Sequence, residues 1–99
     1  MQKKTSYDTL DFEVFGKVQG VYFRKYTQEE AKKLGLVGWV MNTESGTVVG
    51  TLQGPSDKVK TMKNWLLKVG SPKSKIEKCN FTNESQVTEL GFKAFDVRK

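Results

Sequence analysis

Histidine is absent from the 99 residues of this sequence, and cysteine occurs only once, as Cys79. A chain without histidine cannot form a Ser-His-Asp triad or a Cys-His pair, and it cannot offer histidine ligands to zinc. One thiol supports neither a four-cysteine zinc site nor an intramolecular disulfide. We therefore expect a protein without these centres, in which Cys79 is a buried or half-buried small residue rather than a nucleophile.

Long apolar segments are also lacking. No run approaches the ~20 apolar residues of a membrane helix, and the basic start of the chain continues into polar residues instead of the apolar core of a secretory signal. Apolar residues make up 36% of the chain and charged residues 28%, as is ordinary for a soluble globular protein. We expect a cytoplasmic protein without membrane insertion, with one domain over residues 1–99 and a flexible tail at residues 1–6.

Basic residues outnumber acidic ones by 17 to 11, which gives a net charge of +6. Such a charge can attract a polyanion such as nucleic acid, or it can draw in a small anionic substrate. A basic surface without a charged partner is a third interpretation, and composition alone does not decide among the three.

Two hydrophobic periodicities alternate along the chain and predict its secondary structure. A repeat of two residues, or a short apolar run, predicts a strand, and a repeat of 3.6 residues predicts a helix. The predicted strands are 10–15, 37–41, 47–52, 76–81 and 92–97, the last two separated by the polar stretch 83–86; the predicted helices are 22–34 and 56–70, the second capped by Ser56. This order, βαββαβ with a short extra strand, is typical of the α+β ferredoxin-like sandwich, in which two helices pack on one face of an antiparallel sheet.

The same periodicities predict which side chains are buried. Each helix presents one apolar stripe to the sheet, and large aromatic residues are most simply placed in the core. The expected stripes are Phe23, Thr27, Ala31 and Leu34 in the first helix and Val59, Met62, Leu66 and Val69 in the second, with Phe12, Trp39 and Trp65 as core aromatics.

The loop Gly16–Arg24 joins a predicted strand to a predicted helix and has the features of an anion site. The first N–H groups of a helix lack partners within the helix, and glycines let the preceding loop turn its own amides toward an anion. Arg24, in the first helical turn, adds a guanidinium that suits phosphate. The alternative is an ordinary tight loop followed by a surface arginine. No Walker sequence is present.

Asn42 ends an apolar strand just before a turn, with Thr43 beside it. A carboxamide accepts and donates hydrogen bonds, so it can orient a water molecule without taking its proton. The alternative interpretation is that Asn42 only starts the hairpin turn.

Taken together, these segments resemble the acylphosphatase family. Residues 16–24 resemble its first signature and residues 38–43 its second, and the resemblance runs from about Tyr7 to Lys99. It is closest to the common (erythrocyte) type of the animal members. At Tyr22 some members have cysteine, so a thiol in this loop is not essential. Further matching residues are Gly46, Val48, Gly50, Gly54 and the Gly70-Ser71-Pro72 sequence.

The resemblance implies a ferredoxin-like fold and hydrolysis of the carboxyl–phosphate bond of acyl phosphates, without a cofactor or a metal ion. It implies that Arg24 binds the phosphoryl group and that Asn42 positions the attacking water, with support from Thr43. The absence of histidine fits this reaction, because a carboxylate leaving group with a pKa of ~4 needs no general acid. The backbone amides expected to complete the phosphate site are those of Lys17, Val18, Gln19, Gly20 and Val21.

The expected partners are small acyl phosphates and the acylphosphate groups of phosphoenzymes, and we expect a monomer that does not bind nucleic acid. The alternative is an RNA-binding module, which shares the order of elements and a positive charge. Such modules place aromatic residues on a central strand, and the corresponding segment 47–52 has none. An acylphosphatase is therefore the favoured interpretation.

Overall fold

The fold was obtained as a computed structural model, which describes residues 6–98; residues 1–5 of the predicted flexible tail, and residue 99, lie outside this range. Five strands and two helices follow one another in the predicted order. They are β1 (Tyr7–Lys17), α1 (Phe23–Lys33), β2 (Val37–Asn42), β3 (Val48–Gly54), α2 (Ser56–Lys68), β4 (Lys75–Val87) and β5 (Phe95–Arg98).

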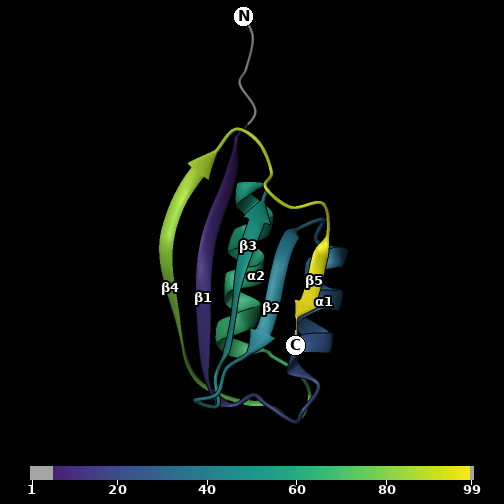
Figure 1. Cartoon of the computed structure of the whole chain (residues 1–99), viewed down its shortest axis with the longest axis vertical. Coiled ribbons are helices and arrows are strands. Elements are labelled where there is room, and N and C mark those ends of the chain that lie inside the picture. The colour runs from purple at the N-terminus through teal and green to yellow at the C-terminus, as the bar shows by residue number, and fades with distance from the viewer. Residues whose placement is uncertain (1–5, 99) are drawn as a thin grey trace, which may run out of the picture.

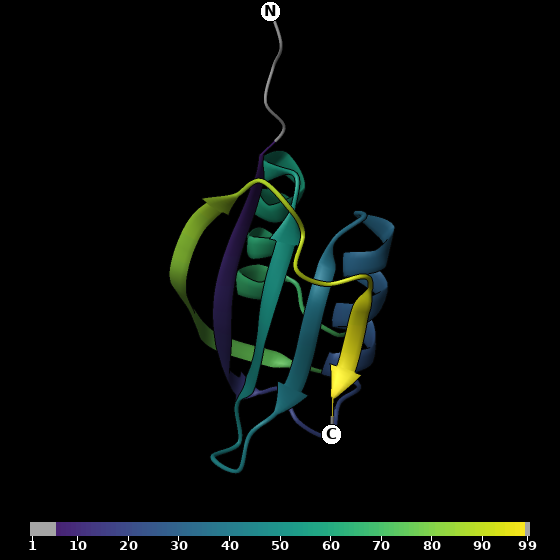
Figure 2. The same cartoon turned by 45° about the horizontal axis from the view of Figure 1, so that its top comes forward.

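The strands form one sheet in the order β4-β1-β3-β2-β5. Neighbouring strands are antiparallel except for β5, which pairs parallel to β2 through Gly38–Met41. Both helices lie on the same face of this sheet (Figures 1 and 2). The ferredoxin-like sandwich predicted from the order of elements is therefore confirmed, including the short fifth strand.

The core lies between the sheet and the two helices. In the middle of β1 the alternating side chains of Leu10, Phe12 and Val14 are buried, because successive residues of a strand point to opposite faces. The helical stripes bury most of the residues predicted from their spacing. Side chains at most 2% exposed include Leu10, Phe12, Val14, Phe23, Thr27, Ala31, Val59, Met62 and Leu66.

Strand β4 is longer than predicted, because the polar stretch 83–86 belongs to it instead of separating two strands. Most of its side chains are exposed, so polar residues are tolerated there, and β1 supplies a continuous backbone partner. The register shifts by one residue between Thr9 and Asp11 of β1. Asn83 lies at this bulge with a φ of 53°, and its amide nitrogen donates to Asp11 Oδ2 at 2.8 Å. The bulge therefore accommodates the polar residues.

Four further predictions were wrong in detail. The last strand begins at Phe95, not at residue 92, because its pairing with β2 starts at Phe95, opposite Gly38. Val69 is 56% exposed, since α2 ends at Lys68 and the helical spacing no longer applies beyond it. Ser56 does not cap α2: the cap position is Pro55, and the Ser56 hydroxyl donates to a carboxylate of β1.

The fourth prediction that was wrong is the placement of Trp39 in the core. It is only half-buried, because Val40 takes the core-facing position next to it and Trp39 points to the face that the helices leave uncovered. There the guanidinium of Arg98 lies 4.5 Å from the centre of its ring. Trp65 is partly buried against the core, as expected, and its ring is 5.7 Å from that of Phe23.

Candidate active site

The loop between β1 and α1 turns sharply at two positions with left-handed backbone. Gly20 has a φ of 75° and Tyr22, at the cap position of α1, has a φ of 60°. Glycine adopts this conformation at no steric cost, whereas a side chain is strained by it. Among the described residues no side chain caps α1, and none of its first-turn residues is acidic. The first N–H groups of α1 therefore keep their positive partial charge for an anion.

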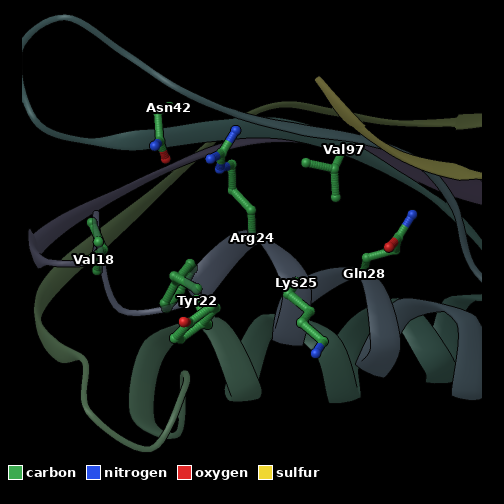
Figure 3. Close-up of a pocket in the computed structure, with 9 residues that line it drawn as sticks. Val18, Tyr22, Arg24, Lys25, Gln28, Asn42 and Val97 are labelled. Carbon is green, nitrogen blue, oxygen red and sulfur yellow. The ribbon is translucent and has the colours of Figure 1, made fainter. Parts of the chain in front are cut away.

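A cavity of about 430 Å³ opens at this end of the sheet (Figure 3). It brings together the β1–α1 loop, the first turns of α1, the end of β2 and the last strand, β5. The lining residues are Val18, Gly20, Tyr22, Phe23, Arg24, Lys25, Gln28, Asn42 and Val97. Arg24 and Asn42, the two side chains expected to act on the substrate, therefore line the same cavity.

Asn42 is the last residue of β2, and its side chain points into the cavity (Figure 3). Its Oδ1 is buried and has no hydrogen-bond partner among the described residues. A buried acceptor without a partner costs ~1–3 kcal/mol, so such an atom usually serves a water molecule or a ligand. The carboxamide is thus available to hold a molecule in the cavity.

Arg24 reaches from the first turn of α1 toward Asn42, as Figure 3 shows. Its Nη1 donates to the backbone oxygen of Arg98 at 3.1 Å. A guanidinium has several other N–H donors in one plane, and these suit the oxygens of a phosphoryl group. The bond to β5 orients this cation without using up its hydrogen-bonding capacity.

Gln19 links the β1–α1 loop to the hairpin between β2 and β3. Its Nε2 donates to the backbone oxygens of Thr43 and Thr47, each at 2.8 Å. The hairpin directly follows Asn42, so one side chain fixes the loop of the expected phosphate site against the strand that carries Asn42.

Thr43 does not line the cavity but anchors the hairpin. Its hydroxyl lies 2.7 Å from the hydroxyl of Thr47 and accepts from the Thr47 N–H at 3.1 Å. The Thr47 hydroxyl in turn donates to Glu13 Oε2 at 2.7 Å, which ties the hairpin to β1. This chain of contacts restrains the turn beside Asn42.

The five residues whose amides were expected to bind phosphate lie in different positions. Val18 and Gly20 line the cavity. Lys17 is the last residue of β1 and pairs with β4, Gln19 extends to the hairpin, and Val21 is 8% exposed in the core. The phosphate-binding role of all five amides stays a prediction.

Several lining residues were not predicted from the sequence. Gln28 lies one helical turn after Arg24, and its Nε2 donates to the backbone oxygen of Phe95 at 2.8 Å. The spacing of four residues on a helix was a signal that could have placed it beside Arg24. Val97 and the Arg98 carbonyl reach the site only because β5 pairs parallel to β2. No local sequence pattern predicts that pairing.

Among residues 6–98, the features of two other kinds of site are absent. No group of three or more cysteine or acidic residues is arranged to hold a metal ion in this part of the chain. Neither helix that the structure describes is long and apolar enough to cross a membrane.

Comparison with known proteins gives consistent matches. The family model described as Acylphosphatase matches residues 10–97. Acylphosphatase-2 of Homo sapiens is 54% identical over 98 residues, covering 99% of both chains. Acylphosphatase-2 of Anas platyrhynchos is 60% identical over 91% of this chain and 87% of its own, and Acylphosphatase-1 of Xenopus tropicalis is 59% identical over 92% and 93%.

Solved structures agree with these sequences. An acylphosphatase from Bacillus subtilis superimposes with a TM-score of 0.83 at 33% identity, covering 93% of this chain and 99% of its own. One from Coxiella burnetii gives a TM-score of 0.84 at 31% identity, covering 98% of each chain. Because the family model, the curated relatives and the solved structures match nearly the whole length, the chain belongs to the acylphosphatase family and hydrolyses acyl phosphates.

Proposed function

We propose that Arg24 holds the phosphoryl group of the acyl phosphate and that Asn42 positions the water that attacks its phosphorus. The observation that carries this proposal is the buried Oδ1 of Asn42, which has no partner among the described residues and lies on the same cavity as Arg24. An amide oxygen accepts a hydrogen bond from water and so directs a lone pair of that water toward phosphorus.

The chemistry needs little from the protein beyond positioning and charge. The oxygen of water bonds to phosphorus while the bond from phosphorus to the acyl oxygen breaks, and the carboxylate leaves with the electron pair. A carboxylate with a pKa of ~4 leaves without being protonated, so no general acid is required. Both protons of the water remain with the phosphate product. This agrees with a chain that has no histidine.

Stabilisation of negative charge is then the main task of the site. The transition state of phosphoryl transfer is loose and spreads charge over the equatorial oxygens, which fixed N–H donors and a guanidinium can bind. We assign this task to Arg24 and to the backbone amides of residues 17–21, with the uncapped start of α1 adding its dipole. These groups supply the charge stabilisation for which other phosphoryl-transfer enzymes use a metal ion.

Gln19 and Thr43 act as positioning residues in this proposal. Each joins the hairpin to another part of the site, Gln19 to the phosphate loop and Thr43 through Thr47 to β1. A displacement of about 1 Å between water and phosphorus is enough to slow such a reaction ~100-fold. Holding the two loops together is therefore part of catalysis.

We further propose that the protein works as a cytoplasmic monomer without a cofactor, as one domain over residues 1–99. The cavity is lined by residues of a single chain, so no second copy is needed to complete it. The single thiol, Cys79, is free and buried, which suits a reducing compartment. Substrates of this class include small acyl phosphates and acylphosphate groups on phosphoenzymes, and the open cavity suits both.

Hydrolysis of benzoyl phosphate with and without EDTA tests the metal-independent mechanism, with inorganic phosphate as a competitor. We expect the same turnover in both conditions and competitive inhibition by phosphate. Loss of activity in EDTA that is restored by a divalent cation would contradict the mechanism, and non-competitive inhibition by phosphate would contradict the assigned phosphoryl position.

A further inference from the structure

Tyr22 combines a strained backbone with a side chain that contributes little to the core. Its φ of 60° and ψ of 24° lie in the left-handed region, which costs a residue with a side chain ~1–2 kcal/mol. Its side chain is 74% exposed, so burial of the ring does not offset this cost. Strained residues of this kind cluster at ligand sites, and Tyr22 lines the cavity that holds Arg24 and Asn42.

The cavity is larger than a phosphoryl group requires. Its volume of about 430 Å³ falls within the range of ~300–1,000 Å³ that is usual for whole small-molecule ligands. Apolar side chains lie around the charged centre: Figure 3 shows Val18 and Tyr22 to one side of Arg24 and Val97 to the other. Val97 is 38% exposed, so it too offers apolar surface to a ligand.

The direction of the reaction places the acyl group near Tyr22. In an in-line displacement the leaving oxygen lies opposite the attacking water. Asn42, which is assigned to that water, approaches the cavity from the sheet, and Tyr22 borders it from the side of α1 (Figure 3). A carboxylate that leaves away from Asn42 therefore carries its acyl substituent toward the tyrosine ring.

We propose that Tyr22 forms an acyl-binding subsite that favours acyl phosphates with an aromatic or extended apolar acyl group over those with a small one. This inference rests on the proposed positions of the phosphoryl group and the water. An aromatic acyl group packs on the exposed ring by stacking or edge-to-face contact and removes apolar surface of both partners from water. A methyl group, as in acetyl phosphate, reaches little of that surface.

The test is the ratio of kcat/KM for benzoyl phosphate to that for acetyl phosphate. In Tyr22→Ala we expect kcat/KM for benzoyl phosphate to fall about tenfold, and that for acetyl phosphate less than about threefold. Tyr22→Phe keeps the ring and is expected to keep the preference. Tyr22→Gly, whose backbone accepts φ 60° without strain, should show the same loss of preference as Tyr22→Ala.

Tyr26→Ala is the matched control. Tyr26, in the first turn of α1, is also exposed, at 38%, and it does not line the cavity, so its removal should leave the ratio as it is. Equal losses for the two substrates in Tyr22→Ala, or an unchanged ratio, would overturn the subsite.

Inhibition by inorganic phosphate distinguishes a failure of the Tyr22 subsite from a failure of the proposed phosphoryl position on which it rests. Phosphate has no acyl group, so we expect its inhibition constant in Tyr22→Ala to stay within about twofold of the wild-type value. A larger rise would show that Tyr22 acts through the phosphate loop, which also overturns the subsite. Failure of phosphate to compete in the wild-type protein would instead refute the assigned phosphoryl position.

Discussion

The side-chain nitrogen of Gln19 lies 2.8 Å from the backbone oxygen of Thr43, and this bond joins the two halves of the site. The loop before α1 is expected to hold phosphate, and the hairpin after Asn42 determines where that carboxamide points. The same nitrogen also donates to Thr47, so the contact restrains both sides of the hairpin turn. In the proposed mechanism, the distance between phosphorus and the attacking water thus depends on the Gln19 side chain.

Replacing Gln19 by methionine keeps a long unbranched side chain but removes both hydrogen bonds. Loss of two such bonds is expected to lower the free energy of unfolding by ~1–3 kcal/mol. We also expect kcat for benzoyl phosphate to fall at least about tenfold, because the water and the phosphoryl group are no longer held at the reactive distance. Urea unfolding and steady-state kinetics at about 10 °C, where the variant is still folded, measure the two effects separately.

Gln53→Met is the control for Gln19→Met. Gln53 also bridges distant segments, since its amide donates to Thr9 and accepts from the Gly91 N–H, but it does not line the cavity. This variant should lose stability and keep kcat. A wild-type kcat in Gln19→Met would show that Gln19 only stabilises the fold.

Removing the Asn42 side chain should separate turnover from phosphate binding. In Asn42→Ala we expect kcat to fall ~100–1,000-fold, as when one essential positioning or oxyanion group is lost from other enzymes. The inhibition constant for phosphate should change less than about threefold. Since Oδ1 is a buried acceptor without a partner among the described residues, the variant should be at least as stable as the wild type in urea. A wild-type kcat for benzoyl phosphate in Asn42→Ala would contradict the role given to this residue.

Replacing Arg24 should affect phosphate binding and turnover together. Arg24→Gln removes the charge proposed to bind the phosphoryl oxygens in the ground state and in the transition state. We therefore expect the inhibition constant of phosphate to rise, and kcat to fall, each at least about tenfold. Arg24→Lys keeps the charge but not the planar fork and should recover only part of either. Lys32→Gln, on the last turn of α1, lowers the net charge equally and controls for long-range attraction. An equal loss in Lys32→Gln would contradict a local role for Arg24.

Local patterns were enough to predict the fold but only part of the site. The alternation along β1 and the stripe of α1 depend on neighbours in the sequence, and both were confirmed. Arg24 and Asn42 are expected from the loop and strand that carry them, and the structure brings them to one cavity. Features that depend on pairing between distant segments were not predictable in this way.

Three particular residues show what local patterns could not give. The polar stretch around Asn83 was predicted to separate two strands, yet pairing with β1 makes it part of one strand. Val97 reaches the cavity only through the parallel pairing of β5 with β2. Gln19 was expected to contribute its backbone amide, but its side chain makes contacts 24 and 28 residues away. Each of these follows from tertiary structure, which overrides local propensity.

The thiol of Cys79 should be unreactive in the folded protein. Burial raises the pKa of Cys79 to about 12 from an ordinary 9.0, and a backbone hydrogen bond at Glu13 opposes the shift only in part. Thiolate is the reactive form, so at about pH 8 a disulfide reagent should label the folded protein far more slowly than the urea-unfolded chain.

The same shift makes stability depend on pH in a defined direction. Between about pH 9 and pH 12 the unfolded thiol loses its proton while the folded one keeps it, so the folded state binds more protons and its stability falls as the pH rises. Cys79→Ala lacks this contribution, whereas all other side chains are common to both proteins. The stability of the wild type relative to Cys79→Ala, measured in urea, should therefore decrease from about pH 8 to pH 10.5. A difference that is constant over this range, together with rapid labelling of the folded protein, would mean that the thiol is open to solvent.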